Sequence, residues 1–423
     1  MKKNAKLNLW LWKWHFIAGI ISLPFILVLA VSGGWYLFKD IIERPETDRA
    51  RTVDVKGTPL SFQEQWDIAQ KATTKQINSV VLPKTKNKAT EFVSGRFSNT
   101  LESVYINPFT GDITNHRVVR NTFMYKVRKF HGELLMGSFG TKIVELAACW
   151  MVVLVLTGIY IWWPKQKWKS KRLFSIRTGH GKRILFRDLH AVTSFWISAL
   201  LLLILAGGLP WTDVFGHNYK WLQEVTHTGY PETWNNSNYR SVKQGDPVPL
   251  DSVIQLTYGL QLPGKTTITL PENEKGVFTV KNETPALENQ QIFHIDRYSG
   301  KIIGKDQWKN VGVMMRSRMW LMNFHEGKFG TWNFILVFLT AVLLTLASAS
   351  ALCSYLLRKK RGDWGIPPVP PQYKAGKGII AFIILLGICL PLFGLSLIII
   401  YGSYSIKQRF SWSVKNTGLI QKG

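Results

Sequence analysis

Cysteine is scarce in this sequence, and the motifs of several enzyme classes are missing altogether. The chain has 423 residues and three cysteines, Cys149, Cys353 and Cys389, which all lie in strongly apolar stretches. Its polar regions therefore lack a disulfide framework and a cysteine metal site. His-Glu-x-x-His, phosphate-loop and Gly-x-Ser-x-Gly sequences do not occur either. A zinc hydrolase, a nucleotide-driven pump and a serine hydrolase consequently have no support.

Acidic residues are also few, with 26 Asp and Glu against 53 Lys and Arg, and the formal net charge is +27. Most of the excess lies in three short segments: the N-terminus up to Lys13, the stretch 165–187 with nine cations and the stretch 358–377 with six. Nucleic-acid binding is one interpretation of such a charge. Because these cations adjoin apolar stretches, however, they predict membrane topology anchors and no nucleic-acid partner.

Five stretches carry almost no charge and are long enough, or nearly so, to cross about 30 Å of hydrocarbon as a helix. They are Phe16–Phe38, Leu146–Trp163, Ala191–Thr212, Phe329–Leu357 and Gly378–Ile406. Tryptophan and tyrosine stand at several of their ends, as is typical of a membrane interface. A buried core helix is the alternative for any one stretch. Together they predict a polytopic α-helical membrane protein with about five spans in a lipid bilayer.

The basic segments also predict the orientation. Short basic segments stay on the cytoplasmic side, so we expect the N-terminus inside and the long regions 39–140 and 213–330 outside. The first apolar stretch exceeds the core of a signal peptide, which is about 7–15 residues, and is interpreted as a retained anchor. One feature opposes a fifth span. It would place the tail 407–423 outside, although this tail contains four cations.

Three sequence landmarks occur twice in the same order, which indicates a tandem duplication of 1–163 as 185–357. The landmarks are a His that leads to Gly-Gly (His15 to Gly33, His190 to Gly207), an ungapped match (105–113 with 294–302) and a Phe-His before Gly-x-Phe-Gly-Thr (His131, His325). Both copies run in the same direction, so a pseudo-two-fold axis along the membrane normal is expected. Equivalent residues then lie at equivalent depth.

Each polar region predicts one helix against a small antiparallel sheet. Ser61 and Glu64 form a capping pair at the start of the first helix, and the second helix is expected near Leu250–Tyr258. The strand-like runs are Asn78–Leu82, Thr90–Ser94 and Ser103–Ile106, then Thr266–Leu270, Gly276–Val280 and Gln291–Ile295. Turns at Asn107–Gly111 and Asp296–Gly300 suit hairpins with Gly at a positive φ. We therefore expect two small α+β domains.

Four of the nine histidines occupy matched positions at span boundaries, His15 with His190 and His131 with His325. In a two-fold arrangement each pair faces across the bundle axis at one depth. Two imidazoles on opposite sides of an iron macrocycle are a b-type haem ligation. The sequence therefore predicts two b-type haems, with these histidines as axial ligands of the iron. For a single boundary histidine, an interfacial residue or a helix cap is the alternative.

The surroundings of the four histidines are compatible with haem. Covalent c-type attachment is excluded, because no Cys-x-x-Cys-His sequence occurs. Cations that are candidates for the haem propionates are Lys13, Arg128, Lys129, Arg187, Arg316 and Arg318. The other histidines have no partner spacing and are interpreted as having no site role: His116, His180, His217, His227 and His294.

These motifs together resemble the PepSY-associated transmembrane family over roughly residues 8–360. The residues that carry the resemblance are Lys13-Trp14-His15, Ser32-Gly33-Gly34, Val104–Gly111, Phe130-His131-Gly132, Gly158–Pro164, Asp188-Leu189-His190 and Asn323-Phe324-His325. The resemblance implies a bacterial inner-membrane haem protein with PepSY-like domains in the periplasm, and it assigns the axial roles to His15, His131, His190 and His325. Better-known members reduce iron held in siderophores and release it as Fe(II).

The resemblance thus implies an oxidoreductase that passes electrons across the membrane to a ferrisiderophore or another ferric chelate. No flavin- or nicotinamide-binding segment is visible, so the electron donor is left open between a quinol and a cytoplasmic reductase. Two alternatives are a haem-free PepSY protein that binds or regulates a periplasmic protease, and an iron-complex permease. The expected segments are spans in 8–40, 126–164, 188–212, 319–357 and 378–406, and periplasmic domains in 41–125 and 213–318.

Overall fold

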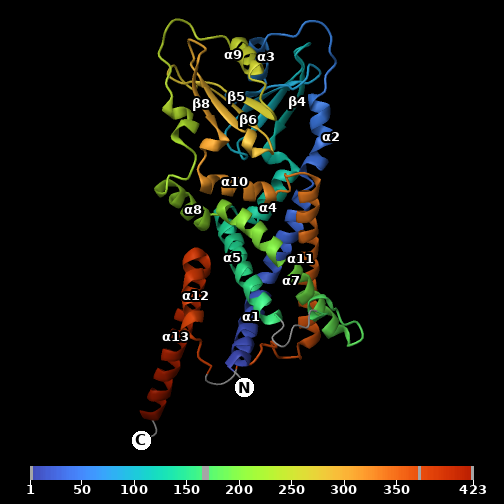
Figure 1. Cartoon of the computed structure of the whole chain (residues 1–423), viewed down its shortest axis with the longest axis vertical. Coiled ribbons are helices and arrows are strands. Elements are labelled where there is room, and N and C mark those ends of the chain that lie inside the picture. The colour runs from blue at the N-terminus through green and yellow to red at the C-terminus, as the bar shows by residue number, and fades with distance from the viewer. Residues whose placement is uncertain (1–2, 164–170, 370–372, 421–423) are drawn as a thin grey trace. The chain divides into compact units, whose positions relative to one another are not determined.

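The computed structural model describes residues 3–163, 171–369 and 373–420, and the chain divides into two compact units (Figure 1). The membrane unit comprises Met1–Val31, His131–Tyr219 and Leu339–Gly423, and the sheet unit comprises Ser32–Phe130 and Lys220–Phe338. Each unit therefore takes segments from both copies of the repeat.

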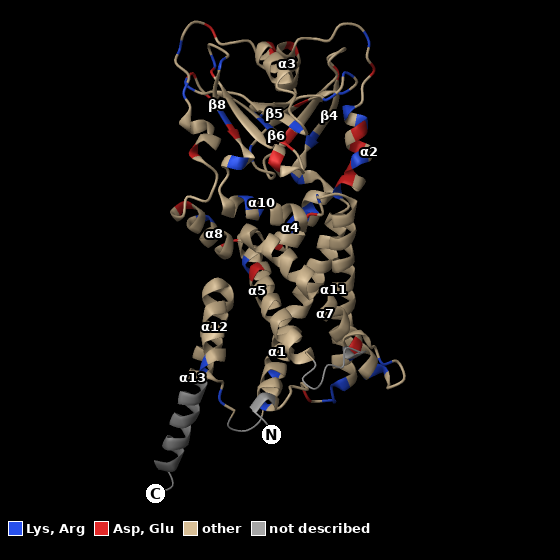
Figure 2. Cartoon of the chain, viewed as in Figure 1, with Lys and Arg blue, Asp and Glu red and all other residues tan. Residues whose placement is uncertain are grey.

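Four helical segments in the described part of the chain are long and apolar enough to cross a membrane: Ala5–Arg51, Gly137–Trp162, Lys182–Trp211 and Thr331–Arg358. They contain the helices α1 (Lys3–Tyr36), α5 (Gly137–Trp162), α7 (Lys182–Gly208) and α11 (Thr331–Arg358). Figure 2 shows long stretches of these helices without a charged residue. The protein is therefore a membrane protein, and four of the expected spans have the length and composition that crossing requires.

Apolar contacts join these helices within the membrane unit. Ala18 and Ile26 of α1 pack with Leu154 of α5 and with Leu344 of α11. At the other side of α5, Trp162 packs with α7 and with the short helix α6 (Lys171–Phe174). The guanidinium of Arg358, the last residue of α11, lies 4.6 Å from the ring centre of Phe16 on α1. The start of α1 and the end of α11 therefore lie together, and the basic segments next to them share one end of the unit.

The stretch expected as a fifth span forms two helices, α12 (Lys377–Cys389) and α13 (Pro391–Ile420). The chain reverses between them: a Cβ added to Gly394 would lie 2.6 Å from the carbonyl oxygen of Gly387. Pro391 cannot continue the α12 hydrogen-bond ladder, which explains the break. The 13 residues of α12 measure about 20 Å, less than the hydrocarbon thickness. The single fifth span is therefore replaced by a helical hairpin.

The turn of this hairpin packs against the middle of α5 and the end of α7. Leu390 and Phe393 are buried beside Cys149 and Leu209, and the rings of Phe393 and Trp150 meet edge to face at 4.9 Å. Both ends of the hairpin consequently point back toward the end of the unit where α11 finishes. This arrangement predicts that the tail and the basic loops share one side of the membrane, which a single fifth span would not allow.

The hairpin predicts the side of the C-terminal tail. In a variant without its three native cysteines, a cysteine introduced at Ser413 should react with a membrane-impermeant maleimide from the same side as one at Ser175. A cysteine at Ser237, in the sheet unit, should react from the opposite side. Labelling of positions 413 and 237 from one side would instead show that 378–406 crosses the membrane once.

The sheet unit contains one eight-stranded antiparallel sheet in the order β4-β3-β2-β1-β5-β6-β7-β8. The strands are β1 (Ile77–Val81), β2 (Thr90–Ser94), β3 (Glu102–Ile106), β4 (Ile113–Val118), β5 (Lys265–Thr269), β6 (Phe278–Glu283), β7 (Gln291–Ile295) and β8 (Ile302–Gln307). The helices are α2 (Lys39–Arg51), α3 (Phe62–Lys71), α4 (Phe123–Glu133), α8 (Val214–Val225), α9 (Leu250–Gly259) and α10 (Val313–His325), of which α4 and α8 continue into the membrane unit. Each copy contributes one covering helix, as predicted, and four strands, one more than the three strand-like runs expected, because the chain pairs again after each turn as β4 or β8.

The two copies share this sheet instead of forming separate domains. Strand β1 pairs with β5, and Val80 lies directly opposite Ile268. These two residues occupy the same position in the two copies, since each lies opposite the buried residue of its own neighbour, Phe92 or Val280. The halves are therefore related by an approximate two-fold axis between Val80 and Ile268.

The two faces of the sheet differ because side chains alternate along each strand. Val80, Phe92, Val104, Ile268 and Val280 line one face and are almost wholly buried with α3 and α9. The capping box of Ser61 and Glu64 starts α3 as predicted, and the Asp251 carboxylate of α9 accepts hydrogen bonds from the Phe62 and Gln63 amides at 2.8 and 3.2 Å. The residues between the apolar ones are largely polar and line the opposite face.

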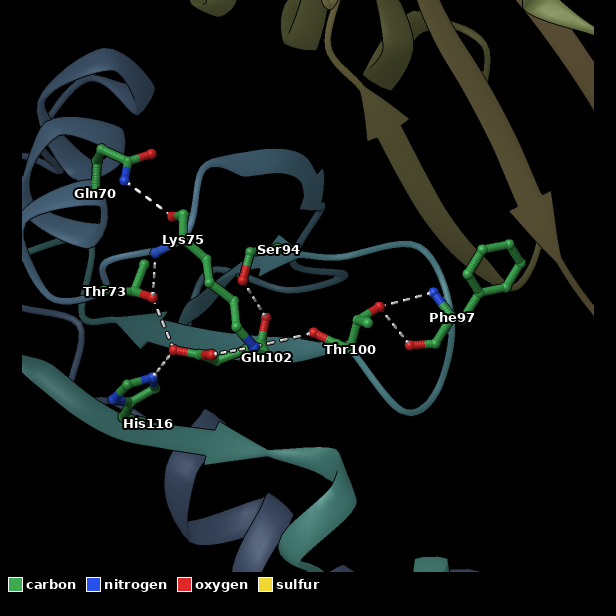
Figure 3. A network of polar contacts seen from close by, with 8 residues as sticks. All are labelled: Gln70, Thr73, Lys75, Ser94, Phe97, Thr100, Glu102 and His116. Carbon is green, nitrogen blue, oxygen red and sulfur yellow. Dashed lines mark hydrogen bonds and ion pairs between the residues drawn. The ribbon is translucent and has the colours of Figure 1, made fainter. Parts of the chain in front are cut away.

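A polar network joins β3 to the segment after α3 (Figure 3). The Glu102 carboxylate accepts a hydrogen bond from Thr73 at 2.7 Å, contacts Lys75 Nζ at 2.8 Å and His116 Nε2 at 2.6 Å. The bond from Lys75 is the main reason that the pKa of Glu102 falls to about 2, and Thr73 and His116 lower it further against the effect of burial. Glu102 therefore holds an edge of the sheet in its charged form.

The Glu102 network predicts a pH dependence of stability. A carboxylate with a depressed pKa stabilises the folded state above its unfolded pKa, near 4.5, and this contribution disappears as the pH falls toward 2. Glu102→Gln should lower the Tm of the purified protein at pH 7 by on the order of 5 °C, and the difference from wild type should shrink below pH 4. The exposed Glu288, changed to Gln, is the control and should have little effect at any pH. A constant difference between pH 7 and 3 would contradict the assignment.

Candidate functional site

Two of the four predicted ligands lie together in the membrane unit. His15 on α1 and His190 on α7 have ring centres 6.5 Å apart, with an angle of 58° between the ring planes. Each is in the first half of its helix and both helices begin at the same end of the unit, so the repeat brings equivalent residues to equivalent depth. The structure therefore brings these two histidines together, and their role as haem ligands stays a prediction.

The ring of His15 is oriented by Thr157 on α5. His15 Nδ1 and Thr157 Oγ1 are 2.9 Å apart, and the Thr157 hydroxyl also lies 2.7 Å from the carbonyl oxygen of Val153. A hydroxyl has one proton, which the Val153 carbonyl accepts because it has no proton of its own. Thr157 Oγ1 must then accept from His15, so the proton is on Nδ1. The lone pair of His15 is consequently on Nε2.

His190 has the same tautomer for a different reason. Its Nδ1 lies 3.0 Å from the carbonyl oxygen of Ala347 on α11, which only accepts. Nδ1–H therefore donates, and the lone pair is on Nε2 again. Histidines that bind a metal commonly donate their second ring nitrogen to a carbonyl or another acceptor, which holds the ring and raises its basicity. Both rings thus have the tautomer that metal binding through Nε2 requires.

The spacing of the two rings fits a haem iron between them. Metal–imidazole bonds are about 2.0–2.1 Å, so two rings on opposite sides of one ion have centres about 6 Å apart. The 6.5 Å between His15 and His190 agrees with this value. No group of three or more His, Cys, Asp or Glu suited to a metal occurs among the residues that the structure describes. Two imidazoles alone suit a macrocycle, which supplies its own four equatorial nitrogens.

Gly158 makes room for the His15 ring. A Cβ at this position would lie 3.2 Å from His15 Cε1, closer than most real contacts. Gly158 is the first residue of the Gly158–Pro164 motif at the end of α5. Its neighbour Thr157 forms a hydrogen bond with the same His15 ring. The absence of a side chain at 158 and the hydroxyl at 157 thus set the position of His15 together.

Two arginines bind the carboxylate just before His190. Asp188 is fully buried and contacts Arg177 Nε at 2.7 Å and Arg187 Nη2 at 2.8 Å. The Arg187 side chain, expected at a haem propionate, is thereby directed to Asp188. This cluster ties the loop before α7 to the helix two residues before the histidine, so it positions the start of α7.

The second predicted pair comes from two different units. His131 lies in the last turn of α4 and belongs to the membrane unit, whereas His325 is the last residue of α10 and belongs to the sheet unit. Both thus occupy the C-terminal end of a helix that precedes an apolar helix, as the repeat requires. The pairing of His131 with His325 stays a prediction.

The histidines without an expected role are found in structural contacts or at the surface. His294 is fully buried, contacts the Thr279 hydroxyl at 3.1 Å and the Thr233 carbonyl at 3.0 Å, and stacks on Tyr239. His116 belongs to the Glu102 network. Sequence reasoning missed Thr157 and the Ala347 carbonyl, because neither residue type signals a role when the fold is unknown.

Gly158 provides a test of the site. If haem lies between His15 and His190, Gly158→Ala should displace the His15 ring by a few tenths of an ångström, lower the haem content of the purified protein and shift its Soret band. Gly19→Ala is the matched control, because its Cβ would make an ordinary 3.8 Å contact with Leu154. Both changes add the same helix propensity. Equal spectra for the two variants would show that the His15 ring needs no space at position 158.

A known protein family matches most of the chain. The model of the family described as PepSY-associated TM region matches residues 12–358, which include all four paired histidines and all eight strands. No curated protein matches the chain. The length of the family match is decisive, and the protein belongs to the PepSY-associated transmembrane family.

Proposed function

We propose that the protein is a b-type haem protein of the bacterial inner membrane that passes electrons across the membrane and reduces a ferric chelate, such as a ferrisiderophore, on the periplasmic side. The observation that supports it most strongly is the pair of His15 and His190, with ring centres 6.5 Å apart and both Nδ1 protons engaged. Each histidine is held by one hydrogen bond from Nδ1 to another helix, to Thr157 or to Ala347. Helix packing alone does not explain why the two rings also lie next to each other.

The side chains of the membrane unit would perform distinct tasks. His15 and His190 would hold the haem iron through Nε2, and Thr157 and the Ala347 carbonyl would keep both rings in the binding tautomer. Bound haem supplies a one-electron redox centre, whose potential depends on its ligands and on burial. His131 and His325 would hold a second haem nearer to the periplasm. Two centres at different depths give an electron path through the bilayer.

The basic segments support the proposed orientation. Positively charged loops are retained in the cytoplasm, and the segments beside α1, α7 and α11 lie at one end of the membrane unit (Figure 2). The strands and the helices α3 and α9 then face the periplasm. The electron donor at the cytoplasmic end would be a quinol or a cytoplasmic reductase.

Reduction of a ferric chelate follows from the chemistry of iron. Siderophores bind Fe(III) through hard oxygen donors and bind Fe(II) much more weakly, because ligand preference depends on the charge and hardness of the ion. One electron delivered to the chelated Fe(III) on the periplasmic side would therefore give Fe(II), which the chelate would release.

Haem binding is tested by the histidine variants. His15→Ala and His190→Ala should each remove one low-spin haem, measured by the haem-to-protein ratio and the reduced-minus-oxidised spectrum. His131→Ala and His325→Ala should remove the other haem, and His217→Ala should remove none. Wild-type protein without a Soret band, when produced with sufficient haem, would favour the haem-free alternative that binds a periplasmic protease.

The acceptor is tested with the reduced protein. Dithionite-reduced wild type should be reoxidised by a ferrisiderophore without oxygen, and ferrozine should trap the Fe(II) that is released. His131→Ala should abolish this transfer, because the electron must leave through the outer haem. Haem that stays reduced with every ferric chelate, yet is oxidised rapidly by a quinone, would refute a ferric-chelate acceptor. Uptake of the intact chelate into proteoliposomes without reductant would favour the permease alternative.

A further inference from the structure

The polar face of the sheet borders a cavity of about 740 Å³. Its floor is formed by the residues that alternate with the buried core, among them Glu91, Ser103, Tyr105 and Thr267. Helices α2 and α4 provide further lining residues. Every lining residue belongs to the sheet unit. The volume lies in the range of small-molecule sites, which is about 300–1,000 Å³.

Cations outnumber anions around this cavity. The lining contains seven basic residues, Lys39, Arg51, Arg96, Arg117, Arg128, Lys265 and Lys281, and four acidic ones, Glu43, Glu91, Glu272 and Glu283. The difference, seven minus four, leaves three positive charges. A concave surface with an excess of one charge attracts a ligand of the opposite charge.

The acidic residues are already engaged, so the excess is available to a ligand. Glu91 contacts Arg51 at 2.9 Å and Lys265 at 3.9 Å, and Glu43 contacts Arg117 at 2.6 Å. Burial opposes the charge of Glu91, but Lys265 and Arg51 hold its pKa below the usual range. Glu91 therefore stays ionised, and Glu91 and Glu43 are each paired with cations of the lining.

Three cations are left with little or no carboxylate of their own. Arg128 donates to the Ser98 hydroxyl at 2.9 Å and stacks over Tyr125 at 5.2 Å. Lys39 lies 6.0 Å from the ring centre of Tyr36. Lys265 reaches only the long contact with Glu91, which Arg51 already neutralises. A ligand with several anionic oxygens would satisfy all three.

The floor also contains two neutral hydroxyl groups. Burial raises the pKa of Tyr105 to about 12, so its hydroxyl keeps its proton. The Ser103 hydroxyl donates to Glu91 Oε1 at 2.9 Å, so its one proton already holds that carboxylate. The ammonium and guanidinium groups are distributed over the whole cavity, which suits an oxygen-rich ligand that is larger than a single phosphate.

We infer that this cavity binds a multiply anionic metal chelate with carboxylate or catecholate donors. The metal in this assignment rests on the proposed function, whereas the preference for an anion rests on the lining alone. The site would hold the chelate on the polar face of the sheet before iron is reduced, and it would discriminate against neutral chelates of the same size.

Gallium(III) complexes test binding separately from electron transfer, since Ga(III) has the charge of Fe(III) and is not reduced by haem. Calorimetry on the purified full-length protein should detect a trianionic gallium tris-catecholate at least tenfold more tightly bound than a neutral gallium trihydroxamate. Lys265→Gln and Arg128→Gln should each weaken the trianionic complex by on the order of fivefold, and added salt should weaken it too. Arg51 and Arg117 are left unchanged, because their loss would strand a carboxylate in the unit.

Lys301→Gln is the matched control, because it removes one exposed cation from the turn before β8, outside the cavity. Equal binding of the neutral complex, equal binding of inorganic phosphate, or wild-type affinity in both cavity variants would overturn the inference. The two proposals fail separately. Reduction of ferric chelates without any gallium binding overturns the cavity site, and gallium binding without reduction overturns the proposed function.

Discussion

Hydrocarbon offers no hydrogen-bond partners, and this constraint governs every polar group between the ends of the membrane helices. The backbone satisfies it by forming helices. Side chains satisfy it by pairing with other helices: His15 with Thr157, and His190 with the Ala347 carbonyl. Glu145, which is fully buried on α5, accepts the Val214 and Phe215 amides at the start of α8. The polar residues of the membrane unit thus fasten its helices to one another, and the same bonds set the histidine tautomers.

In the sheet unit the constraint is different: one face of the sheet is apolar and buried, and the other face carries polar side chains. Eight strands give a face large enough for both α3 and α9, and the shared core joins Val80 to Ile268 at its centre. A four-stranded sheet from one copy would leave β1 or β5 with an unpaired edge, which is a hazard for aggregation. Pairing these edges with each other removes the hazard and creates a polar surface twice as wide. The cavity occupies that surface, mainly over the first copy and the β5 and β6 strands of the second.

Local features of the fold were predictable because they depend on short stretches of sequence. The capping box at Ser61, the strands β2 and β7 and the turns that end at Gly111 and Gly300 all agree with expectation, and both glycines have positive φ. The pairing of β1 with β5 was not predictable, since it joins residues about 190 positions apart whose alternation only requires some partner. The hairpin at Pro391 was missed for a related reason. Apolar length alone does not distinguish one span from two short helices, and the distinction depends on how Leu390 and Phe393 pack against α5.

The sequence by itself determined the membrane location, the duplication and the four histidines at matched positions, because hydropathy, repeated motifs and residue type are properties of the chain. Only the tertiary structure decided that His15 and His190 meet at 6.5 Å, that Thr157 and Ala347 orient them, and that Asp188 engages Arg187. It also decided that Arg128, Lys265 and Tyr105 line one cavity. Apart from the neighbours Arg187 and Asp188, these residues are far apart in the chain. Their proximity arises from helix packing and strand pairing, which depend on contacts that no local pattern encodes.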